Sequence, residues 1–137
     1  MTYQPSPEKV QLGAQMSREF LGDAVISDLQ KARAKTDIFA RTSKEYIAEV
    51  CFASYARPGL KFRERSLMNI AMLIALGRGP ELRIHLKAAA HNGLTEEEIC
   101  EACRHAMIYC GVPAGRDALL AASEVAEEMK GVDKEQT

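Results

Sequence analysis

The sequence has no excess of charge of either sign, and this argues against a nucleic-acid partner. Its 137 residues include 18 Lys and Arg against 19 Asp and Glu, which gives a formal net charge of −1. Proteins that bind DNA or RNA neutralise phosphates with a basic surface, and a near-neutral chain lacks such a field. We therefore expect no nucleic acid among the partners of this chain.

Long hydrophobic runs are also missing. The longest candidate, residues 67–76, is interrupted by Asn69 and is far shorter than the roughly 20 residues that a membrane-spanning helix needs. Residues 1–10 contain no basic stretch followed by an apolar run, so we expect no secretory signal. We expect a cytoplasmic protein without a membrane partner, folded as a single domain over residues 1–137, because this length is typical of one domain.

Patterns typical of β-strands are almost absent, whereas good helix formers such as alanine, leucine and glutamate dominate. Helix-start and helix-stop signals predict helices at about residues 6–22, 23–33, 43–55, 63–76, 80–91, 95–110 and 113–129. The segment 63–76 is apolar on nearly all sides after its first turn, so we expect it to be the buried central helix. The predicted fold is all-α, a compact bundle of about six to seven helices with short connections.

The four cysteines include one Cys-x-x-Cys pair, Cys100 and Cys103, and no second pair that would complete a zinc site. Cys100, Cys103, Met107 and Cys110 follow one another at steps of three, four and three residues, which places them on one helical face. Free cysteine is among the most buried residue types. We therefore predict a stripe of core side chains and no metal site, with a redox role for Cys100 and Cys103 as the alternative.

Glu81 and His85 are four residues apart, so their side chains meet on one face of the predicted helix. A carboxylate beside an imidazole favours the charged ring and raises its pKa, which suits a general acid at neutral pH. Leu82, Leu86 and Ala89 form an adjacent apolar stripe, so we expect the pair to border the packed side. The alternative is a Glu/His pair on an exposed face with no chemical role.

Arginines flank the segment 63–76 at both ends, at positions 57, 63, 65 and 78. A guanidinium group recognises a carboxylate through paired hydrogen bonds, so these residues are candidates for holding an acid. For Arg63 we favour the simpler role of solvating a helix end. Further along, His105 and Tyr109 share a helical face, and we expect Tyr109 to lie in the core with its hydroxyl satisfied.

The order and spacing of several segments resemble the carboxymuconolactone decarboxylase family. The resemblance extends over residues 57–115, and residues 18–25 resemble the opening helix of the family. The segments that carry it are Arg57–Leu60, Arg65–Leu67, Leu76–Arg78, Glu81–His85, Asn92–Gly93 and Tyr109–Pro113.

The resemblance implies an alkyl hydroperoxidase D-like all-α fold and a homo-oligomer, typically a hexamer built as a trimer of dimers, with sites near subunit contacts. It also implies a carboxy-lyase without a cofactor, acting on 4-carboxymuconolactone or a related small lactone or carboxylic acid in the degradation of aromatic compounds. On this hypothesis His85, charged by Glu81, donates a proton to carbon. The candidate substrate-binding residues are Arg65, Arg78, Arg57 and His105.

The same superfamily contains thiol peroxidases, whose site is a Glu, then Cys-x-x-Cys, then His. With His85 as the histidine, this spacing falls on Ser66, Arg78 and Glu81, so both thiols and the glutamate are replaced. A thiol peroxidase needs a thiolate nucleophile, and the departure favours the decarboxylase branch. Two alternatives remain: a thiol-dependent antioxidant protein of the alkyl hydroperoxidase type, and a non-catalytic helical oligomer that binds an acidic metabolite.

Overall fold

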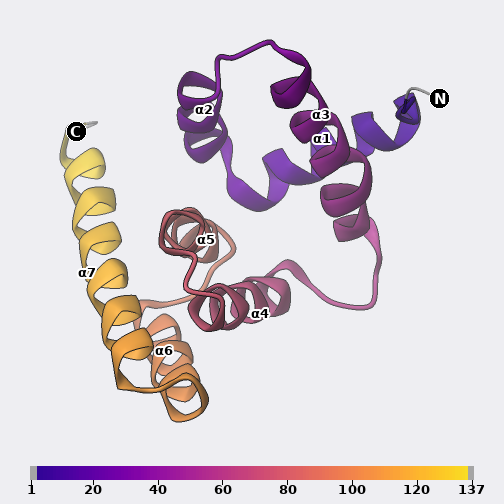
Figure 1. Cartoon of the computed structure of the whole chain (residues 1–137). Helices are drawn as coiled ribbons and strands as arrows, with labels where there is room; N and C mark the ends of the chain where they lie inside the picture. The colour runs from indigo at the N-terminus through magenta and orange to yellow at the C-terminus, as the bar shows by residue number, and fades with distance from the viewer. Residues whose placement is uncertain (1–2, 136–137) are drawn as a thin grey trace. The chain divides into compact units, whose positions relative to one another are not determined.

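The computed structural model describes residues 3–135, and the chain divides into two compact units, Met1–Lys61 and Phe62–Thr137. Every regular element in the described part of the chain is a helix (Figure 1). This confirms the predicted all-α fold, whereas the single domain stays a prediction. No helix within residues 3–135 is long and apolar enough to cross a membrane.

The first unit begins with two helices that match the predicted bounds, α1 (Pro7–Leu21) and α2 (Asp23–Ala32). Ser6 caps α1, because its hydroxyl accepts a hydrogen bond from the backbone N–H of Lys9. This satisfies one of the backbone donors that the first turn of a helix leaves without a partner. Pro7 follows directly, where its missing N–H costs no helical hydrogen bond.

The third predicted helix, residues 43–55, was wrong in its start and in its regularity. The structure has an α-helix, α3 (Ile38–Tyr46), followed by a π-helix, η1 (Ile47–Phe52), and a 3₁₀-helix, η2 (Ala53–Ala56). The helix starts early because the carboxylate of Asp37 accepts a hydrogen bond of 3.0 Å from the backbone N–H of Ala40. An aspartate cap of this kind is among the strongest helix-start signals.

Helix α1 packs against η1 and η2 within the first unit. At Gly13 the two backbones approach so closely that an added Cβ would overlap the carbonyl group of Ala48. Further along α1, the ring of Phe20 meets that of Tyr55 edge to face, with ring centroids 4.8 Å apart. Aromatic pairs in this arrangement stabilise packing beyond the area that they bury.

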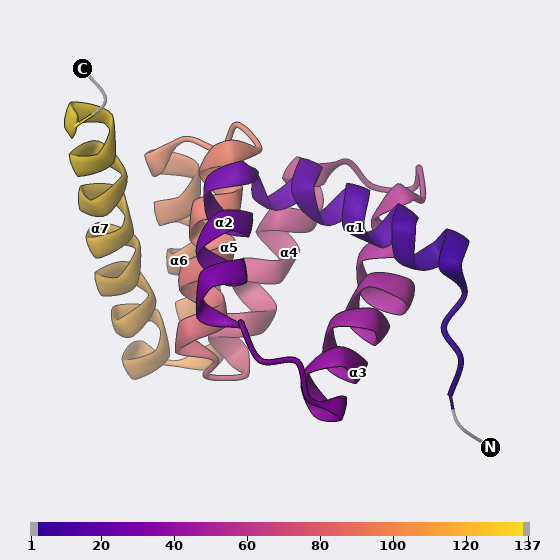
Figure 2. The same ribbon diagram turned by 90° about the horizontal axis from the view of Figure 1, so that it is seen from above.

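The second unit contains α4 (Phe62–Ala75), α5 (Gly79–His91), α6 (Glu96–Cys110) and α7 (Val112–Glu135). These four helices lie side by side in Figure 2, where α5 packs on α4 and α7, and α6 packs on the same two helices. Gly93 lies in the turn between α5 and α6, and Gly111 lies in the turn between α6 and α7. Their φ angles are 87° and 95°, which glycine adopts at little cost. The core is formed by Ile70, Ile74, Leu82, Leu86, Ala89, Leu94, Ile99, Cys103, Ala106, Ala118 and Val125.

Two expectations about this unit were wrong. Helix α4 is not buried on all sides, since within it only Ser66, Ile70 and Ile74 are fully buried. The last helix does not end near Met129 but continues to Glu135. An ion pair of 3.0 Å between Lys130 and Glu96 of α6 ties the added turns to the rest of the unit.

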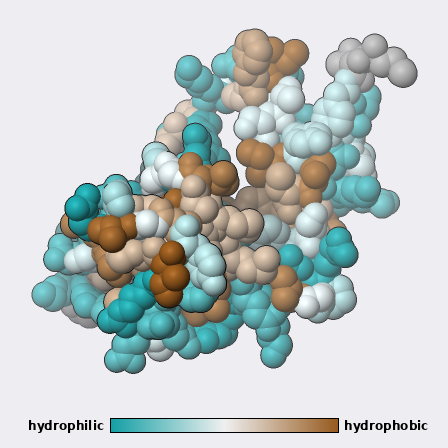
Figure 3. All heavy atoms as spheres, turned by 60° about the horizontal axis from the view of Figure 1, so that its bottom comes forward, coloured by the Kyte–Doolittle hydropathy of each residue, from teal (hydrophilic) through white to brown (hydrophobic). Residues whose placement is uncertain are grey.

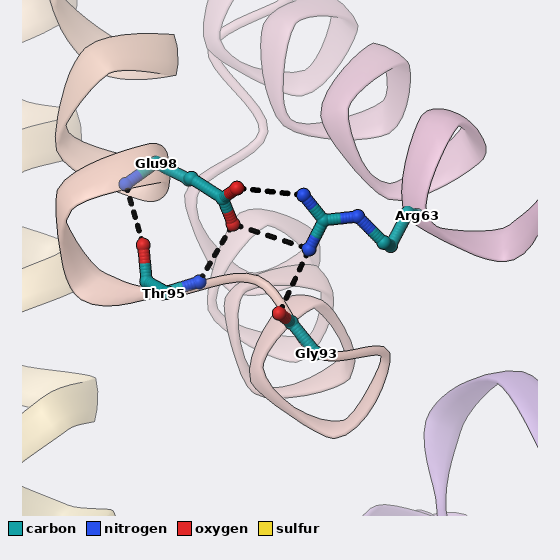
Figure 4. A network of polar contacts seen from close by, with 4 residues as sticks. All are labelled: Arg63, Gly93, Thr95 and Glu98. Atoms are coloured by element: carbon teal, nitrogen blue, oxygen red, sulfur yellow. Dashed lines mark hydrogen bonds and ion pairs between the residues drawn. The ribbon is translucent and has the colours of Figure 1, made fainter.

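Arg63 connects the start of α4 to the start of α6 (Figure 4). Its guanidinium donates to both carboxylate oxygens of Glu98, at 2.6 and 3.2 Å, and to the carbonyl oxygen of Gly93 at 2.8 Å. Glu98 and Thr95 also form a capping box, in which each side chain bonds the backbone N–H of the other. Arg63 therefore has a structural role, but a different one from the expected solvation of a helix end, because its guanidinium bonds α6 and the loop before it.

We predict that Gly13→Ala destabilises the protein by about 2–3 kcal/mol, because the new methyl group must push apart two packed backbones. Gly131→Ala is the matched control, since Gly131 also lies within a helix but an added Cβ meets nothing within 4 Å. The control should leave stability unchanged or raise it by about 0.5–1 kcal/mol. Thermal unfolding followed by circular dichroism measures both, and equal stability of the two variants would contradict the close approach.

Candidate functional site

Helix α5 positions Glu81 and His85 at the edge of the core. Leu82, Leu86 and Ala89 are buried in the second unit, as the predicted apolar stripe requires. Glu81 and His85 lie on the adjacent stripe and are half-buried. The predicted border position of the pair is therefore confirmed.

Glu81 is paired with an arginine at the start of α5. Arg78 is the N-cap residue of the helix, and its Nη2 donates a hydrogen bond of 2.9 Å to Oε1 of Glu81. The side chain of Arg78 is 61% exposed and that of Glu81 is 39% exposed, so water screens the pair and it contributes little to stability. A guanidinium has five N–H donors, so Arg78 retains the capacity to bind a second carboxylate beside that of Glu81.

Polar residues of α4 contact His85 and the end of α5, and sequence reasoning did not select them as site residues. Nδ2 of Asn69 lies 3.4 Å from Nδ1 of His85. Nδ2 of Asn92 donates a hydrogen bond of 3.1 Å to Oγ of Ser66. One sequence signal was available for the first contact. Asn69 is the single polar residue in the run 67–76, and a polar residue in such a run requires a partner when it packs.

The expected increase in the pKa of His85 was wrong. The carboxylate of Glu81 does favour the charged ring, but burial disfavours it more strongly, and the pKa of His85 is lowered from its ordinary value of 6.5. A half-buried ring loses hydration that would stabilise its charge, and one partly exposed carboxylate does not replace it. The ring of His85 is therefore mainly neutral at pH 7.

The remaining candidate residues are placed differently. Arg65 is half-buried on α4, one turn before Asn69 and on the same face of that helix. Arg57 is exposed and directly follows η2 in the first unit. His105 is exposed on α6, where its ring packs edge-on to that of Tyr109 at 5.5 Å. The expectation of a core position for Tyr109 was wrong, because its side chain is 81% exposed.

The cysteines of α6 follow the predicted core stripe. Cys103 is fully buried, Cys100 and Cys110 are half-buried, and all are free thiols. Burial raises the pKa of Cys103 to about 11, so its thiolate is scarce at neutral pH. Within residues 3–135, no group of three or more His, Cys, Asp or Glu side chains is arranged to hold a metal ion.

The residues on α4 and α5 thus combine an imidazole, a carboxylate and guanidinium groups in an all-helical protein. This set suits acid–base chemistry on a small anion, because the guanidinium groups bind carboxylates and the imidazole carries a proton. The sequence model of the carboxymuconolactone decarboxylase family matches residues 42–124. The chain belongs to this family.

Two relatives are similar over most of the chain. A 4-carboxymuconolactone decarboxylase from Acinetobacter baylyi is 32% identical over 123 residues, which cover 89% of this chain and 90% of the relative. A nitrosuccinic acid decarboxylase from Metarhizium robertsii is also 32% identical over 123 residues, covering 89% of this chain and 82% of that protein. Both names describe carboxy-lyases, so the similarity supports a decarboxylase.

We predict that Glu81→Gln lowers the pKa of His85 further, because Glu81 is the neighbour that raises it against the effect of burial. The ring of the variant should therefore gain its proton at a lower pH than the ring of the unaltered protein, whose pKa is already lowered by burial. Titration of the ring by NMR measures both values. Glu96→Gln, on α6, is the control and should leave the titration of His85 unchanged. A pKa of His85 that stays the same after loss of the Glu81 charge would contradict this account.

Proposed function

We propose that this protein is a decarboxylase that acts, without a cofactor, on a small carboxylic acid such as 4-carboxymuconolactone. The observation that carries the proposal is the placement of His85, half-buried between Asn69 of α4 and Glu81 of its own helix. The similarity to two decarboxylases over most of the chain supports the same class of reaction. A cytoplasmic location stays an expectation.

The two relatives are named for substrates that share one chemical property. When the bond to the departing carboxylate breaks, CO2 leaves and its electron pair stays on the substrate. A conjugated lactone or a nitro group takes up that pair, so the substrate supplies its own electron acceptor. The reaction then needs only a proton delivered to carbon, and we expect the substrate of this chain to have a comparable acceptor group.

His85 is the proposed proton donor. Its lowered pKa means that the ring is mainly neutral before substrate binds. A bound carboxylate beside the ring favours the imidazolium and raises the pKa again, so the substrate itself promotes charging of its donor. The imidazolium gives its proton to the carbon that lost CO2, and water restores the proton to the ring.

Arg65 and Arg78 are the proposed groups that hold the substrate. Arg78 is paired with Glu81, and Glu81 lies one turn of α5 before His85. Arg65 shares a face of α4 with Asn69, the residue that contacts His85. Fixed guanidinium groups orient a carboxylate and stabilise charge that develops on a lactone or acid oxygen. The binding roles of Arg57 and His105 stay predictions.

We predict that the purified protein releases CO2 from 4-carboxymuconolactone, and that His85→Gln reduces turnover about 100-fold or more because the proton donor is lost. Nitrosuccinic acid serves as the second substrate. His91→Gln is the matched control, since His91 is on another face of the same helix, and it should retain activity. Release of CO2 at an unchanged rate by His85→Gln would remove this residue from the mechanism.

A folded protein that binds these acids without releasing CO2 would instead support the non-catalytic alternative. The thiol-dependent alternative requires an accessible thiolate, and the burial of Cys103 with its raised pKa counts against it. A peroxide-reduction assay on the same preparation distinguishes that activity from decarboxylation.

The protein also has a surface suited to self-association, and we propose that it forms a homo-oligomer. Hydrophobic side chains reach the surface in several patches (Figure 3). One face of α4, together with the residue that follows the helix, consists of apolar residues that are exposed in the single chain: Leu67, Met68, Ala71, Met72, Ala75 and Leu76. Soluble proteins seldom leave such a continuous apolar face in contact with water, and the hexamers expected from the family resemblance would cover it with a second copy.

We predict that Met72→Glu lowers the molar mass measured by size-exclusion chromatography with light scattering, because a charge at the centre of this face must be desolvated in the oligomer. Gln30→Glu, at an exposed position of α2, adds the same charge and should leave the mass unchanged. A monomeric unaltered protein at micromolar concentration would contradict the proposed oligomer.

A further inference from the structure

We propose that Asn69 is a positioning residue for His85: its amide holds Nδ1 of the ring and thereby keeps the ring proton on Nε2. The inference rests on the proposed function, since it assigns a role to a residue that acts through the proposed proton donor. The carrying observation is the contact of 3.4 Å between Nδ2 of Asn69 and Nδ1 of His85.

The chemistry of the two groups decides the direction of this hydrogen bond. The amide nitrogen of asparagine has two N–H donors and accepts nothing. Nδ1 of His85 must therefore act as the acceptor, which requires that it carries no proton. In a neutral imidazole the proton is then on Nε2, so the nitrogen that faces away from Asn69 is the one able to donate.

The neutral ring is the relevant form before substrate binds, because burial lowers the pKa of His85. Glu81, four residues earlier on α5, is the charged neighbour that raises it. A neutral ring has two tautomers of similar energy, and only a partner at one nitrogen selects between them. Asn69 supplies that partner from a different helix.

The packing of α4 on α5 fixes the amide in place. Ser66 precedes Asn69 by three residues, is completely buried, and accepts a hydrogen bond of 3.1 Å from Asn92. The two helices are therefore joined by polar contacts at two levels, with His85 at one and Asn92 at the other. Ile70 and Leu86 directly follow Asn69 and His85 in the sequence and are buried in the core, where close packing limits sliding of one helix along the other.

The amide also suits the ring after it gains a second proton. An imidazolium carries N–H on both nitrogens, so Nδ1 then needs an acceptor. Rotation of the Asn69 amide presents Oδ1 in place of Nδ2 without moving the backbone. An aspartate at this position can only accept a hydrogen bond from Nδ1–H, whether the ring is neutral or charged. A leucine has a similar size but forms no hydrogen bond with either form of the ring.

The test compares Asn69→Leu and Asn69→Asp with Ser66→Ala, which removes the hydrogen bond between Ser66 and Asn92 and leaves the contact of Asn69 with His85. The ¹⁵N NMR shifts of the His85 ring identify the protonated nitrogen. We expect Nε2–H in the unaltered protein and in Ser66→Ala, a mixture of tautomers in Asn69→Leu, and protonation of Nδ1 with a raised ring pKa in Asn69→Asp.

The kinetic readout separates positioning from binding. Asn69→Leu should lower kcat about 10- to 100-fold, because a small misplacement of a reacting group can cost a factor of that order, with little change in KM. Protonated Nδ1 in the unaltered protein, or an unchanged tautomer in Asn69→Leu, would overturn the inference. The NMR result does not require turnover, so a protein that keeps the Nε2–H ring but releases no CO2 would contradict the proposed function alone.

Discussion

The structure of the candidate site depends on the burial of one stripe of α5. Leu82, Leu86 and Ala89 are removed from water against Ile70 and Ile74 of α4 and against α6 and α7. Burying a leucine of this kind stabilises the fold by about 2 kcal/mol, so the rotation of α5 about its own axis is firmly set. Because a helix advances 100° per residue, fixing this stripe also fixes the neighbouring one, which carries Glu81 and His85.

The same burial determines the chemistry of His85. Packing at the edge of the core removes part of the hydration of the ring, and this lowers its pKa more than Glu81 raises it. A neutral ring is a poor acid until an anion lies beside it. The proposed substrate is such an anion, so the site gains its acidic form when it is occupied and has little of it when empty. Asn69 determines a second property of the ring. Its contact with Nδ1 selects the other nitrogen, Nε2, as the one from which the proton leaves.

The position of the thiols counts against the peroxidase alternative. The peroxidase spacing falls on Ser66, Arg78 and Glu81, of which Ser66 is buried and hydrogen-bonded between α4 and α5. The actual cysteine pair is one helix later, where Cys103 is part of the core. Burial raises the pKa of the Cys103 thiol to about 11, so its reactive thiolate is scarce at neutral pH. At the two positions where the family resemblance places the peroxidase thiols, this chain has the guanidinium of Arg78 and the carboxylate of Glu81.

The sequence by itself determined the helical class, most helix bounds and the stripe that bears Glu81 and His85, because these follow from local signals such as the Ser6 and Thr95 caps and from helical periodicity. It did not reveal the π-helix at Ile47–Phe52 or the exposure of one face of α4, since both depend on which helices pack against these segments. Only the tertiary structure decided the partner of His85 and the direction of its pKa. The partner, Asn69, is sixteen positions away in the sequence, and the pKa is lowered because the ring loses hydration on burial. Neither can be predicted from the residue pattern of a single helix.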